Sequence, residues 1–424
     1  MENRRLVTYR RCLLVLLVVC GVAMAYIYKF YVVETVPDTI LLRKGQEEKI
    51  SFDIPVSATM AMPDSSYVKT PVATSVRIVP GKEKTYTMDL KYMGIVPLKT
   101  VTLDVISGKE VAISGMPVGI YVKTKGVLVI DTGSYVNEWK EEISPAEGVL
   151  QPGDSILQVN GEEVSGKRFF VGLVEGSDGE EMILTILRGG EVSNVKVQPQ
   201  KNEEGTYKLG VWVRDSAQGL GTLSYITQEG EFAALGHGVN DADLGEIMNL
   251  GHGSIYETNI LAIRKADKAI PGELTGIITF DESDYVGSIE NNTSEGIYGS
   301  LSGEYLLTER GAEFLGDCVV YPVGLKQEIT EGPAQIYCAL SEAPAFYDIH
   351  IDEVIYNPQE NNRGIMLTVT DKQLLSMTGG IVQGMSGSPI VQNGKVVGAV
   401  THVLVKDSTK GYGIFLESML NNGN

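Results

Sequence analysis

Histidine is scarce in this chain, with 4 residues among 424, and cysteine is equally scarce, with 4. The histidines and cysteines lack the close spacing of metal ligands, so the sequence predicts neither a metal site nor a cofactor. Whether Cys318 and Cys338 form a disulfide or remain free thiols is left open. Aromatic residues are also few, with 9 Phe and 2 Trp, whereas glycine is common, with 48. This composition favours short strands and turns, and the fold class we predict is mainly β.

Basic residues are outnumbered, with 35 Lys and Arg against 54 Asp and Glu, which gives a net charge of −19. A nucleic acid requires a basic surface on its partner, so this balance excludes nucleic acid as a ligand. The simplest consequence of the acidic surface is solubility.

Charge is missing altogether from residues 12–28, which follow four arginines. If Lys29 extends toward the headgroups, the apolar segment is long enough to span a bilayer. The arginines before it predict a cytoplasmic N-terminus and export of the remainder, with the N-terminal helix holding the chain to the membrane. The small residues around Ala23 and Ala25 fit a cleaved signal peptide instead. Residues 1–34 are therefore predicted to be a signal-anchor or a signal peptide.

Strand and turn patterns divide the rest of the chain into three regions. Residues 35–108 alternate polar and apolar side chains in KISFDIPV and KTVTLDVI, which predicts a small β-rich region. Residues 109–200 contain GVLQPGDSILQVNGEEV, where Asn160 and Gly161 predict a hairpin turn. A segment of helical spacing, FFVGLVEG, and two further strands follow it. Residues 201–424 consist of short strands interrupted by glycine, which indicates one barrel or a pair of barrels.

The hairpin segment has the pattern L-x-P-G-D-x-I-L-x-V-N-G and resembles a PDZ domain over residues 109–200. The resemblance implies a groove that binds an extended chain, often a C-terminus, along the edge of a sheet. The segment SGMPVGIYVKT precedes this pattern in the chain. From the resemblance, we expect the backbone N–H groups of Val118, Gly119 and Ile120 to bind the peptide.

A second motif lies in GGIVQGMSGSPIVQNGKVVGAVTHV, residues 379–403. Gly384 and Gly387 permit a tight turn, so the amides of Gly384 and Ser386 can converge as an oxyanion hole. The pattern G-x-S-G-x-P is similar to that of trypsin-like serine peptidases, in which the first serine attacks, and it selects Ser386 over Ser388. A Gly- and Ser-rich connection between strands is the alternative interpretation.

A serine nucleophile needs a base, and the sequence offers four histidines. His237 and His252 share the setting L-G-H-G. His350 alternates along a predicted strand and is interpreted as structural, and His402 borders the strand that follows Ser386. A glycine-flanked histidine ahead of the serine is the chain order of trypsin-like enzymes.

The segments FAALGHGVNDAD, EGPAQIY, VTDKQLLSMTGGIVQGMSGSPIVQ and GYGIF together resemble the SpoIVB sporulation peptidases of endospore-forming bacteria. The resemblance implies a trypsin-like double β-barrel with a triad of His237, Asp371 and Ser386. Asp371 departs from the trypsin-like layout, in which the aspartate lies far ahead of the serine. Asp241 and Asp243 are rivals for its role, because they lie close to His237 in sequence.

The resemblance also implies a function and a place. We expect an exported signalling endopeptidase, active between the forespore and mother-cell membranes, that cleaves a membrane-bound regulatory protein. The cleavage would activate an intramembrane protease and a late sigma factor, and copies of the chain would cleave one another in trans. A general quality-control protease is one alternative, although such enzymes place the PDZ domain after the peptidase. A catalytically inactive, membrane-tethered PDZ scaffold is the other, and the retained serine motif argues against it.

Overall fold

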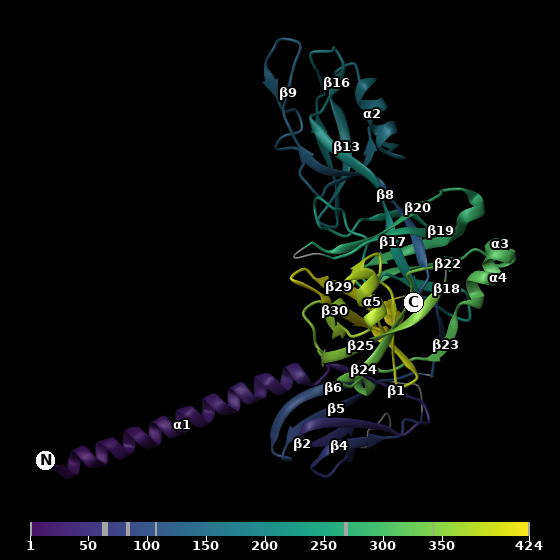
Figure 1. Cartoon of the computed structure of the whole chain (residues 1–424). Helices are drawn as coiled ribbons and strands as arrows, with labels where there is room; N and C mark the ends of the chain where they lie inside the picture. The colour runs from purple at the N-terminus through teal and green to yellow at the C-terminus, as the bar shows by residue number, and fades with distance from the viewer. Residues whose placement is uncertain are drawn as a thin grey trace.

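The structure is a computed structural model that describes residues 2–61, 67–81, 85–106, 108–266, 270–341 and 343–422. Strands dominate it, and they form an N-terminal sheet, two barrels and a unit that lies beyond the first barrel (Figure 1). Helix α1 (Glu2–Thr35) precedes the N-terminal sheet and extends away from it. Among the helices in these ranges, none combines the length and the hydropathy of a membrane span.

The N-terminal sheet has the strand order β1-β6-β5-β2-β3, and β4 also pairs with β2. The alternation predicted for this region is present, because Val101, Leu103 and Val105 of β6 are buried in the core of the sheet. Its strands are β1 (Thr39–Arg43), β2 (Glu48–Ala61), β3 (Tyr67–Lys69), β4 (Ala73–Ile78), β5 (Thr85–Tyr92) and β6 (Val96–Ile106).

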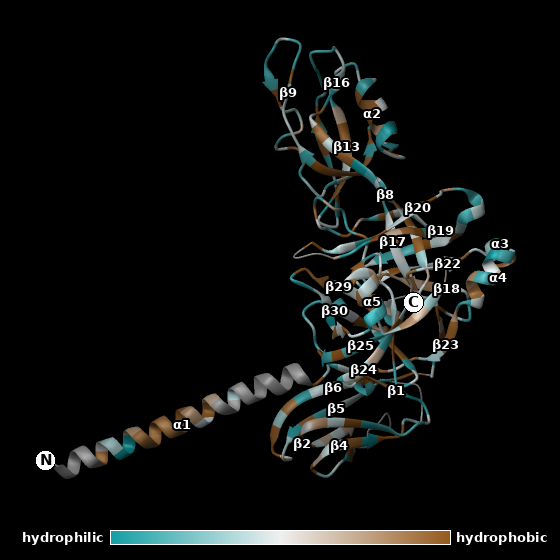
Figure 2. Ribbon diagram, in the orientation of Figure 1, coloured by the Kyte–Doolittle hydropathy of each residue, from teal (hydrophilic) through white to brown (hydrophobic). Residues whose placement is uncertain are grey.

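The first barrel closes through the order β8-β17-β18-β22-β21-β19, because β19 pairs back to β8. Val118, Val122, Leu223 and Ile255 are among the hydrophobic side chains that fill its centre. Hydrophobic and hydrophilic residues both occur along the barrel strands (Figure 2). The barrel strands are β8 (Pro117–Thr132), β17 (Val211–Ile226), β18 (Glu231–Ala234), β19 (Leu250–Arg264), β21 (Tyr285–Thr293) and β22 (Gly296–Leu301). Attached to them are β7 (Glu110–Ile113), β20 (Gly272–Ile278), β23 (Val319–Pro322), β27 (Val382–Gln383), α3 (Gly303–Leu306), α4 (Glu309–Gly316) and the short helix η1 (Glu282–Asp284).

The second barrel is closed in the order β24-β25-β26-β30-β29-β28. Its fully buried centre includes Ile336, Leu367 and Val400. The thiols of Cys318 and Cys338 are both free. The elements of this region are β24 (Gly332–Ala339), β25 (Pro344–Val354), β26 (Ile365–Val369), β28 (Pro389–Gln392), β29 (Lys395–Leu404), β30 (Asp407–Phe415), α5 (Lys372–Thr378), α6 (Leu416–Asn422), η2 (Lys326–Glu328) and η3 (Asn361–Arg363). The two antiparallel barrels follow one another along the chain, in agreement with the predicted trypsin-like fold.

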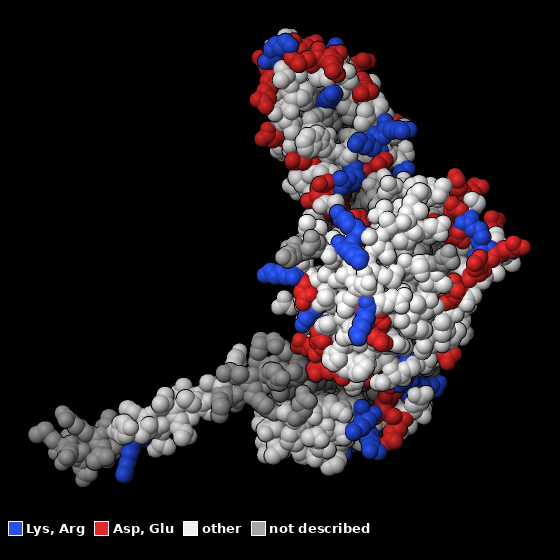
Figure 3. Space-filling model, viewed as in Figure 1, with Lys and Arg blue, Asp and Glu red and all other residues white. Residues whose placement is uncertain are grey.

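Residues 127–213, which we call the distal unit, have a separate core that includes Ile156, Phe170 and Leu184. The predicted hairpin is confirmed, since β11 pairs with β12 across Asn160 and Gly161, whose φ angles are 51° and 86°. Charged side chains are dense on this unit, whereas the barrel face seen in the same view is largely uncharged (Figure 3). Its elements are β9 (Tyr135–Val136), β10 (Glu142–Ile143), β11 (Ser155–Val159), β12 (Glu162–Glu163), α2 (Lys167–Glu175), β13 (Met182–Arg188), β14 (Glu191–Val197), β15 (Gln200–Lys201) and β16 (Tyr207–Lys208).

The peptide-binding role predicted for Val118, Gly119 and Ile120 is wrong. These residues lie inside β8, where they pair with β17 on one side and with β19 on the other. Val118 and Ile120 also point into the core of the first barrel. A strand with partners on both edges cannot take up another chain. The region 109–200 therefore begins with barrel residues, and β8 and β17 each run on from the barrel into the distal unit.

Candidate active site

A cavity of about 680 Å³ is lined by residues of both barrels. The first barrel contributes the middle of β17 and the loop after β18, which carries His237. The second barrel contributes the loop before β28, which carries Ser386, and β29, which carries His402. The structure thus brings two of the three predicted triad residues, His237 and Ser386, to one site.

The loop that carries Ser386 requires glycine on both sides of the serine. Gly384 and Gly387 have φ angles of 99° and 100°, and a Cβ atom on Gly387 would lie 2.0 Å from the carbonyl oxygen of Thr222. The amide of Thr222 donates to the carbonyl oxygen of Ser386 at 2.9 Å, and its hydroxyl donates to that of Gly384 at 2.8 Å. The first barrel therefore holds the serine loop of the second.

The surroundings of the loop distinguish Ser386 from Ser388. Ser388 is fully buried, and its hydroxyl donates to the carbonyl oxygen of Met385 at 2.7 Å. Ser386 lines the cavity. The amides of Gly384 and Ser386 donate no hydrogen bond to another residue of the described ranges. They are available to the oxyanion that forms when a serine attacks a carbonyl group.

His237 follows β18 through Leu235 and Gly236, which both have a φ of 70°. Its Nδ1 atom lies 2.9 Å from the carbonyl oxygen of Gly238. A carbonyl oxygen only accepts, so Nδ1 carries the proton and Nε2 of the neutral ring is free to accept one. Burial lowers the pKa of His237, and the hydrogen bond to Gly238 opposes that shift in part. The side chain is therefore neutral near pH 7, as a general base must be.

The Ser386 hydroxyl points to the backbone rather than to a histidine. Its Oγ atom donates to the carbonyl oxygen of Thr401 at 2.9 Å. Catalytic hydrogen bonds often form only when substrate is bound, so this geometry is compatible with a resting site.

His402 is the second histidine that lines the cavity. Its ring centroid lies 5.4 Å from that of His237, and its buried Nδ1 atom has no hydrogen-bond partner in the described part of the chain. Burial, followed by the nearby charges of His237 and Arg363, lowers the pKa of His402 to about 4. The ring is therefore neutral at physiological pH and adds no charge beside His237.

Among the described residues, no carboxylate hydrogen-bonds to His237 or lines the cavity. Asp371 is the N-cap of α5, where its side chain accepts from the amide of Leu374 at 2.8 Å, and it does not line the cavity. Asp241 and Asp243 both pair with the guanidinium group of Arg214. The contacts of Asp371 are those of a helix cap, and its assignment to the triad stays a prediction from the resemblance.

The remaining histidines lie apart from the cavity. His252 is exposed on β19, and its Nε2 atom contacts the Ser254 hydroxyl at 3.2 Å. His350 is exposed on β25 and contacts Asp352 at 3.0 Å. The two L-G-H-G segments therefore have different surroundings, although their local sequences are nearly the same.

Sequence patterns missed two residues that shape the site, Thr222 and Thr401. Thr222 is joined to the serine loop by hydrogen bonds across the barrel interface, and Thr401 accepts the serine hydroxyl through its backbone. Thr222 belongs to no motif, because it acts through a contact between segments 162 residues apart. Thr401 lies within the quoted segment 379–403 but acts through its backbone carbonyl group, which its residue type does not reveal.

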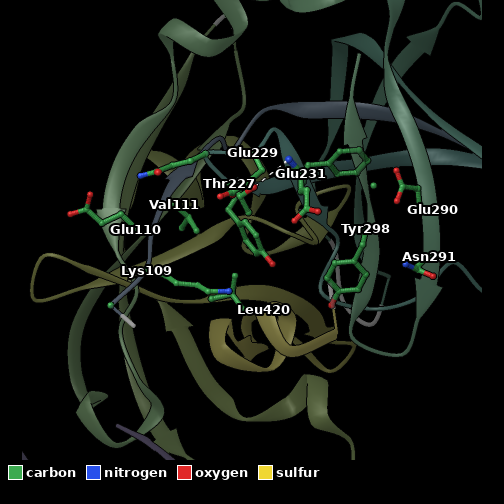
Figure 4. Close-up of a pocket in the computed structure, with 15 residues that line it drawn as sticks. Lys109, Glu110, Val111, Thr227, Glu229, Glu231, Glu290, Asn291, Tyr298 and Leu420 are labelled. Atoms are coloured by element: carbon green, nitrogen blue, oxygen red, sulfur yellow. Dashed lines mark hydrogen bonds between the residues drawn. The ribbon is translucent and has the colours of Figure 1, made fainter. Parts of the chain in front are cut away.

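A second cavity, of about 440 Å³, is shown in Figure 4. Glu229, Glu231, Glu290 and Tyr298 line it together with Lys109, but no serine, cysteine or histidine does. Its described lining therefore contains no serine–histidine or cysteine–histidine pair. Across the described ranges, His, Cys, Asp and Glu side chains form no cluster able to hold a metal ion.

Two closed barrels with a serine on a glycine-framed loop and a neutral histidine in one cavity define a serine peptidase of the double-barrel class. The family model described as SpoIVB peptidase S55 matches residues 205–420, just over half of the chain. The chain belongs to this family of serine peptidases. No curated protein matches the chain.

Proposed function

We propose that this chain is an exported signalling endopeptidase of sporulation that cleaves a membrane-bound regulatory protein. The cleavage would release an intramembrane protease and so activate a late sigma factor. The observation that carries the proposal is that Ser386 and His237 line the same cavity in a chain of the SpoIVB family.

In the proposed reaction, Nε2 of His237 takes the proton of the Ser386 hydroxyl, and Oγ attacks the scissile carbonyl carbon. The amides of Gly384 and Ser386 stabilise the resulting oxyanion. The protonated His237 then gives its proton to the leaving amine, and water hydrolyses the acyl-enzyme by the same steps in reverse order. Asp371 is the carboxylate that the family resemblance supplies for His237.

The placement of the enzyme is part of the proposal. The apolar residues 12–28 and the arginines before them support an N-terminal helix in the membrane and a catalytic part outside the cytoplasm. The distal unit is proposed to be a PDZ domain that binds a peptide or a C-terminus. The motif around Pro152–Asp154, the hairpin after it and helix α2 support this assignment.

An inactive scaffold is the second candidate, because the Ser386 hydroxyl contacts Thr401 and no carboxylate contacts His237. Self-cleavage in trans separates the two candidates. Full-length chain mixed with a tagged Ser386→Ala copy should cut that copy near its N-terminus, as detected by immunoblot. Ser193→Ala, which removes an exposed serine hydroxyl of the distal unit, is the matched control and should cut at the normal rate. An uncut copy in the presence of wild-type chain would favour the scaffold.

The signalling role is tested with the membrane-bound regulator reconstituted beside the intramembrane protease. Wild-type chain should cleave the regulator and switch on processing of the sigma factor, whereas Ser386→Ala should do neither. Cleavage of unfolded proteins at the same rate as the regulator would indicate a general quality-control protease instead.

A further inference from the structure

Strand β17 has one edge that is open for much of its length. Along the other edge it pairs with β8 from Val211 to Thr222. The strand that pairs with the open side, β18, begins its register at Leu223. Between Val211 and Gly221 no strand of the described ranges covers this edge. An uncovered edge presents backbone N–H and C=O groups to any extended chain that approaches it.

Two cavities lie along β17. Near its middle, Ser216 and Leu220 border the cavity that contains Ser386. At its start, Val211 and Val213 border a cavity of about 430 Å³, whose opposite wall is helix α2. We call this cavity, at the start of β17, the α2 groove. Because β8 occupies the other edge of β17 throughout, both cavities open on the same edge of one strand.

A hydrogen bond to helix α2 holds the strand between the two cavities. The strand bulges between Arg214 and Ser216, and the Asp215 carboxylate there accepts from the amide of Lys167, the first residue of α2, at 2.9 Å. This contact fixes the α2 groove relative to the strand that leads to Ser386. The distal unit and the first barrel are also joined by β8 and β17, which run through both (Figure 1).

The far end of the α2 groove offers donors for an anion. Leu209 and Gly210 line the groove, and their amides donate no hydrogen bond to another described residue. Gly210 has a φ of 71°, and a Cβ atom there would lie 2.4 Å from the carbonyl oxygen of Gly133. Successive free amides with one residue in the left-handed region suit a carboxylate. Lys208 lies beside them in the groove lining.

We propose that one extended substrate segment lies along the open edge of β17, with its C-terminal carboxylate at Leu209–Gly210 and its scissile bond at Ser386. This inference rests on the proposed peptidase function. The segment runs antiparallel to β17, since its C-terminus lies at the start of the strand. From Val211 to Leu220 the strand rises by about 3.3 Å per residue, so a substrate bound along this edge is cleaved about ten residues before its free C-terminus. Cleavage near the N-terminus of another copy does not use this edge. The preferred substrate is a polypeptide with an extended, unfolded C-terminal tail.

The test uses peptides with one common cleavage sequence and 3, 6, 10 or 14 residues between the scissile bond and a free C-terminus. With the full-length chain, kcat/KM should rise by roughly tenfold or more once the tail reaches ten residues, because the groove raises the local concentration of substrate. Amidation of the C-terminus, or a proline in the middle of the tail, should remove the rise. A kcat/KM that is independent of tail length or of the carboxylate would overturn the proposal.

Two variants of helix α2 give a matched comparison. Val171 and Phe169 are exposed to similar extents, 39% and 36%, but only Val171 lines the groove. Val171→Arg should abolish the gain with tail length, and Phe169→Arg should retain it. We call the open edge of β17 together with the α2 groove the binding track. An equal gain in kcat/KM with tail length for the two variants would contradict binding of the tail along this track.

The failure of the binding track and the failure of the peptidase function are distinguishable. Fluorescence anisotropy measures binding of the same labelled peptides without any cleavage. Affinity that increases with tail length, and falls on amidation, supports the track even if no peptide is cut, in which case the peptidase function is what fails. If the affinity does not depend on tail length, the proposed binding along β17 is wrong, whatever the cleavage rate.

Discussion

At the scale of single residues, the reactive side chains of the site are held by backbone carbonyl groups. His237 donates from Nδ1 to Gly238, which fixes the tautomer that leaves Nε2 free, and Ser386 donates to Thr401. In a triad, an aspartate normally fixes that tautomer. Here the carbonyl oxygen of Gly238 already supplies part of the same function. The base is therefore prepared in the resting site, while the nucleophile still has to turn toward it.

The lowered pKa of His237 predicts a pH profile. Protonated imidazole cannot accept the serine proton, so activity is lost as the pH falls through the pKa of His237 in the folded enzyme. Burial lowers this pKa below the ordinary value of about 6.5. The acid limb of kcat/KM for a short peptide should therefore have its midpoint below pH 6.5. A midpoint at or above 6.5, with tyrosine fluorescence showing a folded chain, would contradict this environment for the base.

The role of Asp371 is tested by Asp371→Asn. Asparagine caps a helix as well as aspartate does, so the melting temperature should stay close to that of the wild type. If Asp371 orients His237 in the working enzyme, as the family resemblance predicts, kcat should fall by roughly ten-thousandfold because the amide favours the wrong tautomer of the imidazole. Wild-type kcat in a stable Asp371→Asn chain would leave Asp371 as a helix cap and nothing more.

The sequence predicted the residues that a local pattern determines. The turn around Ser386 and the setting of His237 are encoded by neighbouring glycines, and the structure places both residues in one cavity. The contact of Thr222 with the serine loop depends on which segments pack together. That information is absent from short motifs, because the partners lie far apart along the chain.

At the scale of elements, β17 links the two parts of the site. Its residue Thr222 is almost fully buried and holds the serine loop through both its amide and its hydroxyl. Strands β8 and β17 are each long enough to belong to the barrel at one end and to the distal unit at the other. Strand patterns in the sequence indicated the strands but not this sharing, so the predicted boundaries at 109 and 201 did not match the structure.

Thr222→Val tests the hold of β17 on the serine loop. Valine keeps the shape of threonine but leaves the carbonyl oxygen of Gly384 without its donor. A net loss of about 1 kcal/mol per hydrogen bond corresponds to a roughly fivefold fall in kcat if the loop loses its position. Thr258→Val is the control, because that hydroxyl also donates to a carbonyl group, on β20, but away from Ser386. Equal kcat values for the two variants would remove Thr222 from the positioning of Ser386.

At the scale of the whole molecule, a charged contact joins the N-terminal sheet to the second barrel. Arg43 of β1 pairs with Glu328 at 2.6 Å and donates to the carbonyl oxygen of Val323 at 2.8 Å. Lys395 of β29 also pairs with Glu328, at 2.5 Å. Burial alone would raise the pKa of Glu328, but hydrogen bonds from Arg43, the Leu325 amide and Lys395 hold it at about 2.

Glu328→Gln should loosen the N-terminal sheet. A shift in pKa from 4.5 to about 2 corresponds to at most about 3 kcal/mol of stabilisation, and solvent screening of this half-exposed carboxylate reduces that figure. Because the folded pKa is the lower one, this contribution is complete above pH 4.5 and is lost as the pH falls toward 2. Hydrogen exchange at pH 7 should accelerate in β1 of the variant. Glu47→Gln, which removes an exposed ion pair with Arg77, should have almost no effect. Unchanged exchange in Glu328→Gln would show that apolar contacts alone hold the sheet.

The central claim, that Ser386 is the nucleophile of a working serine peptidase, is tested most directly with a fluorophosphonate probe. The full-length chain is incubated with the probe, digested and sequenced by mass spectrometry. Modification should occur at Ser386, should disappear in His237→Ala, and should persist in His252→Ala, whose histidine lies outside the cavity. A chain that stays unlabelled while folded, or that is labelled at a different serine, would contradict the account.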